Sequence, residues 1–259
     1  MPGSLISMRK THSSTPPHLW VSGFNPVREV LLTGRVEVLE MIVARSDQRV
    51  RELVELGALR GIAPRQETRD GLSALVGHAH HQGVALRMRE FPYAALEALL
   101  EKPTGEREPL VILDCLQDPQ NLGAMLRSAC FLGARGVIVP RDRSARVTST
   151  VIRIAAGATA YLPVIQVNNL VRALEQLKEC GLWIFGLDAQ AAQTIYDADL
   201  TVPLGLVVGN EQKGLRPLVA RACDAMVRIP EHGPLQSLNA ATSGAIALAE
   251  VQRRRLMGK

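Results

Sequence analysis

The sequence predicts an α/β protein with a largely parallel β-sheet, and three observations lead to this fold class. Short apolar runs alternate with segments that carry helix-starting and helix-ending residues along most of the 259-residue chain. Apolar residues make up 47% of the chain and charged residues 21%, which excludes a wholly disordered protein. No apolar run reaches the length of about 18 residues that a membrane-spanning helix needs. Apolar strands separated by helices are typical of a parallel sheet covered on both faces.

The first part of the chain predicts a compact α/β unit over residues 19–88. Asn25 followed by Pro26 is typical of an N-cap and the first residue of a helix, and Gly34 ends that helix. Asp47 provides a second N-cap. The elements expected in this unit are helices over residues 25–34 and 47–57 and strands over residues 36–44 and 83–87.

Two segments beside this unit lack the pattern of a folded domain. Residues 1–18 are rich in Ser, Thr and Pro and have no apolar stretch like that of a signal peptide, so they predict a disordered tail. Residues 89–108 contain prolines, a glycine and a charge run. They predict a linker with one short helix over residues 93–100.

A second and larger α/β unit is expected over residues 109–259. Gly133 and Gly181 each follow a helical segment and are typical helix ends. The expected strands cover residues 110–115, 136–139, 162–167, 182–187, 204–208 and 225–229. The expected helices cover residues 119–132, 148–156, 170–180 and 237–256.

The cysteine pattern indicates a reducing compartment, and we expect a cytoplasmic protein. The four cysteines lie far apart and form no CxxC pair: Cys115, Cys130, Cys180 and Cys223. This spacing favours neither a zinc site nor a disulfide framework. A histidine cluster at residues 78–81 is followed by no partner at metal-ligand spacing, so no metal site is expected.

The basic residues of the chain are mostly arginines. The formal net charge is +5, and only five of the 30 basic residues are lysines. Because a guanidinium group binds phosphate in a bidentate manner, this bias is consistent with a polyanionic partner such as RNA. A genome with GC-rich codons explains the bias equally well. The aromatic content of 3% argues against a base-stacking platform.

The first segment with unusual chemistry covers residues 118–129, directly after a predicted strand. Asn121 lies near the start of the predicted helix, and Arg127 lies in an apolar stretch of it. A buried arginine needs an anion or a carboxylate as partner. Arg127 therefore indicates either an anion site or a salt bridge within the fold.

The second such segment covers residues 206–215. An apolar strand runs into Gly209 and Gly214, with Asn210 and Glu211 between them. Glycines at the carboxyl end of a strand let a ligand approach the backbone, and open α/β sheets bind ligands at that edge. The spacing is neither GxGxxG nor GxxxxGK[ST], so neither a dinucleotide site nor a P-loop is indicated.

The third segment covers residues 229–241. A stiff loop that begins at Ile229 and Pro230 leads through Ser237, Leu238 and Asn239 into a run of small residues. Ser and Asn are favourable at a helix start, which is the simplest explanation of these positions. The other interpretation is that the loop presents both polar side chains to a ligand.

Taken together and in this order, the three segments resemble the signature motifs of the SpoU/TrmH family of the SPOUT superfamily: NLGAMLRSA, LVVGNEQKGL and IPEHGPLQSLNAA. Members are S-adenosylmethionine-dependent RNA ribose 2′-O-methyltransferases, and the resemblance covers residues 109–257. The segments VSGFNPVREVLLTGR and HQGV resemble the family's N-terminal RNA-binding domain of the ribosomal-protein L30e type. This layout is most similar to that of bacterial 23S rRNA guanosine 2′-O-methyltransferases.

The resemblance implies a fold, a cofactor and site residues. The fold is a parallel sheet with a C-terminal trefoil knot, in a homodimer formed through the knotted domains. The cofactor is S-adenosyl-L-methionine, and the implied residues that bind it are Gly209, Asn210, Gly214, Ile229, Pro230 and Leu238. The implied catalytic residues are Asn121, Arg127, Glu211, Ser237 and Asn239. We expect Arg127 to orient the RNA and Glu211 to hold Arg127 or a loop.

The implied substrate is RNA, with a guanosine of 23S rRNA as the expected target. Two alternatives remain open at this point: a transfer RNA methyltransferase of the same family, and a non-catalytic RNA-binding or ribosome-assembly protein. Two motif positions depart from the family pattern, Gln212 where glycine is common and Glu231-His232 where a Met-small pair is frequent. Neither departure affects the implied catalytic residues.

Overall fold

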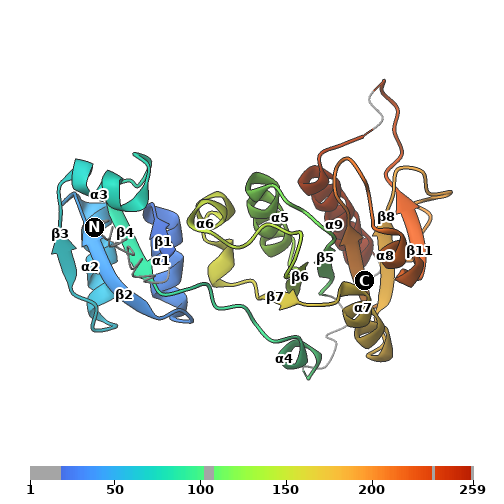
Figure 1. Ribbon diagram of the computed structural model, residues 1–259, viewed down its shortest axis with the longest axis horizontal. Helices are drawn as coiled ribbons and strands as arrows, with labels where there is room; N and C mark the ends of the chain where they lie inside the picture. Colours follow the sequence, from blue (N-terminus) through green and yellow to red (C-terminus); the bar gives the residue numbers. More distant parts are fainter. Residues whose placement is uncertain (1–18, 102–107, 235–236, 258–259) are drawn as a thin grey trace, which may run out of the picture.

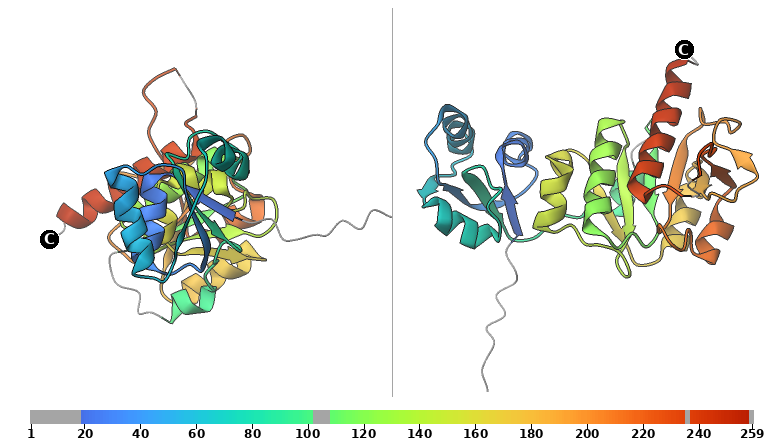
Figure 2. Two further views of the ribbon diagram at one scale, coloured as in Figure 1. Left: turned by 90° about the vertical axis from the view of Figure 1, so that its left-hand side faces the viewer. Right: turned by 90° about the horizontal axis from the view of Figure 1, so that it is seen from above.

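The computed structural model describes residues 19–101, 108–234 and 237–257, which form two α/β units that lie end to end (Figure 1, Figure 2). The predicted tail over residues 1–18 lies outside the described residues. Among the residues described, no helix is long and apolar enough to cross a membrane.

The N-terminal unit is a mixed four-stranded sheet with three helices. Its strands lie in the order β1-β4-β2-β3, and only the β2–β3 pair is parallel. Its strands are β1 Leu19–Ser22, β2 Val38–Val43, β3 Pro64–Gln66 and β4 Val84–Met88. Its helices are α1 Phe24–Thr33, α2 Gln48–Ala58 and α3 Arg69–Val76.

The predicted caps of this unit are confirmed at one helix and wrong at another. The Asp47 side chain accepts a hydrogen bond from the Val50 backbone N–H at 3.2 Å, so it caps α2 as expected. Asn25 lies inside α1, and the N-cap is Gly23 with φ 92°. β1, β3 and α3 were not predicted, because short polar or edge segments carry little periodic signal.

The C-terminal unit is a seven-stranded sheet in which every strand pair is parallel, as predicted. The strand order is β7-β6-β5-β10-β8-β11-β9. Its strands are β5 Leu110–Leu113, β6 Gly136–Pro140, β7 Val164–Val167, β8 Trp183–Leu187, β9 Gln193–Thr194, β10 Leu204–Val208 and β11 Ala225–Arg228. Its helices are α5 Pro119–Phe131, α6 Ser149–Ala155, the 3-10 helix η1 Ala158–Ala160, α7 Leu170–Glu179, α8 Pro217–Ala222 and α9 Ala240–Met257.

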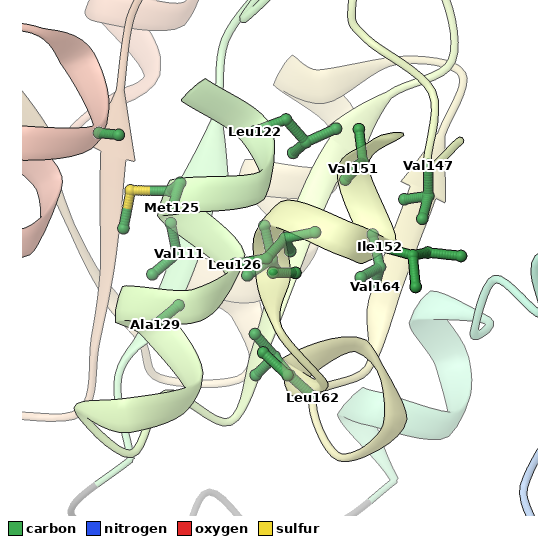
Figure 3. Packing of buried hydrophobic residues seen from close by; sticks show 14 of the residues in the cluster. Val111, Leu122, Met125, Leu126, Ala129, Val147, Val151, Ile152, Leu162 and Val164 are labelled. Carbon is green, nitrogen blue, oxygen red and sulfur yellow. The ribbon is translucent and has the colours of Figure 1, made fainter. Parts of the chain in front are cut away.

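Alternating strand residues of this sheet bury their side chains on two faces. Val111 and Val137 pack with α5, α6 and α9, and Figure 3 shows Leu126 of α5 against Ile152 of α6 on that side. Ile112 and Ile138, one position along, pack with α4, α7 and α8 on the other side. Since each fully buried aliphatic side chain contributes about 1.5–3 kcal/mol, this double cover fixes the sheet and its carboxyl edge.

The described part of the predicted linker, residues 89–101, is packed rather than free, and residues 102–107 lie outside the described residues. Helix α4, Leu96–Leu100, is shorter than the predicted helix, and both Leu96 and Leu99 are buried against the C-terminal sheet. The Ala94 backbone N–H donates to the Val164 carbonyl at 2.9 Å. The sequence did not predict this burial, because a five-residue helix is too short to show a periodic apolar pattern.

The N-terminal unit contacts the C-terminal unit through α1 and β1. The Trp20 backbone N–H donates to the Ser149 hydroxyl at 2.9 Å, and the Arg35 guanidinium donates to the Tyr161 carbonyl at 2.9 Å. The Tyr161 hydroxyl donates to the Glu29 carboxylate. These contacts hold α1 against η1 and β1 against α6.

Candidate functional site

The three segments with unusual chemistry meet at the carboxyl edge of the parallel sheet. The first begins α5 after β5, the second follows β10, and the third follows β11. β5 and β10 are neighbouring strands, and β8 separates β10 from β11. Open α/β sheets bind ligands in the crevice outside this edge, because loops from several strands converge there.

A cavity of about 590 Å³ opens among the loops that follow β8, β10 and β11. This volume lies in the range typical of small-molecule sites. Eight residues predicted from the sequence contribute to its lining: Gly209, Asn210, Glu211, Gly214, Ile229, Pro230, Ser237 and Leu238. Three predicted residues do not line it: Asn121, Arg127 and Asn239.

The loop after β10 folds back tightly on itself. The Asn210 backbone N–H donates to the Gly214 carbonyl at 3.0 Å, and Gly214 returns a bond to the Asn210 carbonyl at 2.8 Å. A Cβ added at Gly209 would lie 2.5 Å from the Gly214 carbonyl carbon, which is backbone and cannot move aside as a side chain could. Only glycine fits here, so the cavity wall at this point is bare backbone.

The Asn210 side chain holds this loop from inside. Its carbonyl oxygen accepts hydrogen bonds from the Gln212 N–H at 3.0 Å and the Lys213 N–H at 3.3 Å. Its amide group donates to the Cys115 carbonyl at 3.3 Å. Asn210 therefore connects the β10 loop to the end of β5.

An ion pair between a buried carboxylate and a partly exposed arginine anchors the other end of the loop, and the sequence did not predict it. Asp114, which is fully buried directly after β5, accepts hydrogen bonds from the Arg216 backbone N–H and from the Arg216 Nε, both at 2.7 Å. The signal in the sequence is an acidic residue that immediately follows an apolar strand. Its partner lies 102 positions later, so the pair is not visible from spacing.

Two asparagines and a glutamate form a hydrogen-bonded cluster beside the cavity. The Asn121 amide group donates to the Glu211 carboxylate. The Asn239 amide group donates to the Asn121 carbonyl oxygen at 2.7 Å and to Glu211 at 2.8 Å. The structure thus brings together one predicted residue from each of the three segments.

Asn239 also caps the last helix, which begins later than predicted. Its side-chain oxygen accepts hydrogen bonds from the Ala241 N–H at 2.9 Å and the Thr242 N–H at 3.2 Å. The prediction that this helix starts at Ser237 is wrong, because Asn239 provides the cap and α9 begins at Ala240. Ser237 instead lies exposed in the loop and lines the cavity.

Arg127 does not have the environment expected from the sequence. It lies on an exposed position of α5 and forms no hydrogen bond or ion pair within the described part of the chain. The expectation that it is buried is wrong, because its neighbours Leu126 and Ala129 point into the core and it does not. Glu211 accepts hydrogen bonds from Asn121 and Asn239 and forms no hydrogen bond or ion pair with Arg127.

The cavity combines apolar walls with groups of both charges. Leu187, Val227 and Ile229 provide apolar surface, as an aromatic base requires. Its carboxylates are those of Asp188, Glu211 and Glu231, and its basic side chains are Lys213, Arg228 and His232. In the described residues no three His, Cys, Asp or Glu side chains are grouped as metal ligands. The cavity therefore offers a bound ligand apolar contact together with acidic and basic side chains.

Comparison with known proteins assigns both units. The family model for the SpoU rRNA methylase family matches residues 108–249, more than half of the chain. The chain belongs to the SpoU rRNA methylase family. A second family model, for RNA 2′-O ribose methyltransferase substrate binding, matches residues 20–94.

Relatives in the SpoU family cover nearly the whole chain. An "uncharacterized tRNA/rRNA methyltransferase" of Mycolicibacterium vanbaalenii is 41% identical over 94% of this chain and 79% of its own. The 23S rRNA (guanosine-2′-O-)-methyltransferase RlmB of Xanthomonas axonopodis pv. citri is 38% identical over 92% of this chain and 97% of its own. The SpoU methyltransferase AviRb of Streptomyces viridochromogenes, crystallised with AdoMet, matches with a TM-score of 0.78 and 26% identity, over 93% and 92% of the two chains.

Proposed function

We propose that this SpoU-family protein transfers a methyl group from S-adenosyl-L-methionine to the 2′-hydroxyl of a guanosine in 23S rRNA. The observation that carries the proposal is the convergence of all three motif segments on one cavity and its adjoining polar cluster. The RlmB relative, 38% identical over nearly its full length, supports the substrate. The AviRb complex with AdoMet supports the cofactor.

The cavity residues fit the cofactor at the level of chemistry. S-adenosyl-L-methionine supplies an activated methyl group, so the protein mainly positions the reactants and handles one proton. Gly209 lets the loop fold closely against Gly214 at the cavity wall, and Ile229, Pro230 and Leu238 provide apolar contact. Asn210 and Gly214 keep the loop in its closed shape.

The cluster of Asn121, Glu211 and Asn239 lies beside the cavity, where the ribose would meet the methyl group of the cofactor. Glu211 belongs to both the cavity lining and the cluster, so it connects the cofactor site to Asn121 and Asn239. Ser237 adds a hydroxyl from the opposite loop. We assign these four residues to positioning of the ribose and of the loops around it.

We propose that the chain forms a homodimer in which Arg127 of one protomer completes the site of the other. Arg127 is exposed and lies outside its own chain's cavity lining, so we assign it to the site completed by a second copy of the chain. Phe131, one turn further along α5, is 87% exposed, and Leu256 and Met257 at the end of α9 are 69% and 72% exposed. Helix α9, red in Figure 2, extends beyond the body of the unit. Such apolar exposure is typical of an interface.

We also propose a C-terminal trefoil knot and an N-terminal domain of the L30e type. The match to the SpoU rRNA methylase family over residues 108–249 supports the C-terminal trefoil knot that the resemblance implies. The mixed four-stranded unit coincides with the substrate-binding family match, which supports an RNA-binding domain of the L30e type.

The test is transfer of a labelled methyl group from S-adenosyl-L-methionine to unmethylated 23S rRNA, with the product nucleotide mapped by mass spectrometry. Arg127→Ala should abolish transfer and leave cofactor binding nearly unchanged in calorimetry, because Arg127 does not line its own chain's cavity. Arg221→Ala, a similar change at an exposed position of α8, should retain both. Full transfer by Arg127→Ala would remove Arg127 from the mechanism, and absence of cofactor binding by the wild type would reject the enzyme.

A further inference from the structure

The loop between β6 and α6 carries an unusual concentration of arginines. Arg141, Arg143 and Arg146 lie within residues 141–147, and all three are exposed. None of the three guanidinium groups forms a hydrogen bond or ion pair with a described residue, and Asp142 is the one acidic residue of this loop. Three guanidinium groups are therefore available to a ligand outside the chain.

The backbone of this loop is held firmly by the rest of the unit. The Ala145 N–H and the Ser144 hydroxyl both donate to the Leu116 carbonyl, at 2.8 and 3.2 Å. The Val147 N–H donates to the Tyr93 hydroxyl at 2.9 Å. A loop with several such anchors keeps its backbone in place, which lowers the entropy cost of ordering the loop on binding.

Arg143 occupies a backbone conformation that arginine rarely adopts. Its φ is +59°, in the left-handed region that favours glycine or asparagine. A side chain kept in this region costs about 1–3 kcal/mol, and such strain is concentrated at functional sites. The surrounding anchors therefore hold the Arg143 backbone in this conformation, and the guanidinium extends from it into solvent.

The loop lies between the N-terminal unit and the cofactor cavity. On the cavity side, Leu116 follows Cys115, whose carbonyl accepts the Asn210 amide of the β10 loop. On the other side the loop leads into α6, which contacts β1 through the hydrogen bond between Ser149 and Trp20. Figure 1 shows α6 as the part of the C-terminal unit that faces the N-terminal unit. RNA that touched both the N-terminal unit and the cavity would pass this loop.

We infer that Arg141, Arg143 and Arg146 bind consecutive phosphates of the RNA between the N-terminal unit and the cavity. The inference rests on the proposed function, because it takes RNA as the substrate. Guanidinium groups bind phosphate oxygens in a bidentate manner, and no exposed aromatic side chain of this loop is present to read bases. The loop therefore contributes affinity and register that do not depend on base sequence.

The test measures RNA binding as a function of salt for the wild type and for the variant Arg141→Gln, Arg143→Gln, Arg146→Gln. The probes are a 23S rRNA transcript and polyuridylate. Each phosphate contact contributes about 0.7–0.9 to the slope of log affinity against log salt, so the slope should become shallower by roughly 2–3. Between 50 and 200 mM salt, the variant should therefore lose roughly 20- to 40-fold less affinity than the wild type. The effect should be alike for both probes, and the KM for RNA should rise with cofactor affinity unchanged.

Two controls separate this inference from its alternatives. Arg221→Gln removes one exposed arginine from the end of α8. Because α8 ends next to the amino end of β11, Arg221 lies at the edge of the sheet opposite the arginine loop, and this variant should retain the wild-type slope. Arg141→Lys, Arg143→Lys, Arg146→Lys keeps the charge and should restore most of the slope. If wild-type transfer is normal and the glutamine variant keeps the wild-type slope, the loop does not bind RNA. If the wild type transfers no methyl group to RNA, the proposed function fails instead.

Discussion

The ion pair between Asp114 and Arg216 predicts a measurable loss of both stability and cofactor binding in Asp114→Asn. The carboxylate accepts two hydrogen bonds at 2.7 Å, one from the Arg216 backbone and one from its guanidinium. Asparagine has one acceptor oxygen, and its amide group would face one of these donors. Because Asp114 is fully buried, water cannot reach it to satisfy the new amide group, whereas the Arg216 side chain is 39% exposed and stays partly solvated. Bonds to a charged group contribute about 1.5–3 kcal/mol, so we expect a loss of about 2–3 kcal/mol.

The assay is thermal unfolding together with calorimetric titration of S-adenosyl-L-methionine. A loss of this size should lower the melting temperature by about 4–12 °C in a domain of this length. It should also weaken cofactor binding by about tenfold or more. If binding must reorder the loop at a cost of about 1.4 kcal/mol, the affinity falls by a factor of ten. Asp142→Asn makes the same chemical change at an exposed position and should alter neither quantity. An unchanged melting temperature in Asp114→Asn would refute the reasoning that this pair anchors the loop.

Two further predictions concern the glycine loop and the last helix. Gly209→Ala should cost about 3 kcal/mol of stability or more and weaken cofactor binding, because its Cβ would lie 2.5 Å from backbone that cannot move aside. Gly214→Ala, with φ +62° and open space, should cost only about 1–2 kcal/mol, and equal urea midpoints for the two variants would argue against the clash. Hydrogen bonds from Arg253 and then Arg254 lower the pKa of Glu250 from 4.5 to about 2. The folded pKa is the lower one, so this contribution to stability is complete above pH 4.5 and is lost as the pH falls towards about 2. Acid unfolding of Glu250→Gln should be less steep over that interval, and an unchanged profile would contradict the assignment.

Local sequence signals predicted most of the C-terminal fold. Apolar runs gave the central strands, and Gly133 and Gly181 follow α5 and α7 closely, both with positive φ. Strand β9 and helix α8 were missed, because a two-residue strand and a six-residue helix are too short for a periodic pattern. The parallel arrangement followed from strands that alternate with helices, and every strand pair of the sheet is parallel.

The sequence predicted which loops form the candidate site, but not which of their side chains form hydrogen bonds with each other. Gly209 and Gly214 mark a strand end where the backbone turns tightly, and such a turn has a local cause. The bond between Asn121 and Asn239 joins residues 118 positions apart, so it depends on which strands become neighbours. The sequence placed Asn121 and Asn239 in separate motifs, and the sheet order brought them together.

The sequence by itself determined the α/β class, the three loops at the sheet edge and the family to which they belong. These are properties of short segments, in which composition and turn chemistry act over a few residues. The tertiary structure decided that Arg127 is exposed and that Asp114 is paired with Arg216. The physical reason is that burial and pairing depend on which surfaces of distant segments pack together, and adjacent residues of a helix face different directions, so an apolar neighbour does not make Arg127 buried.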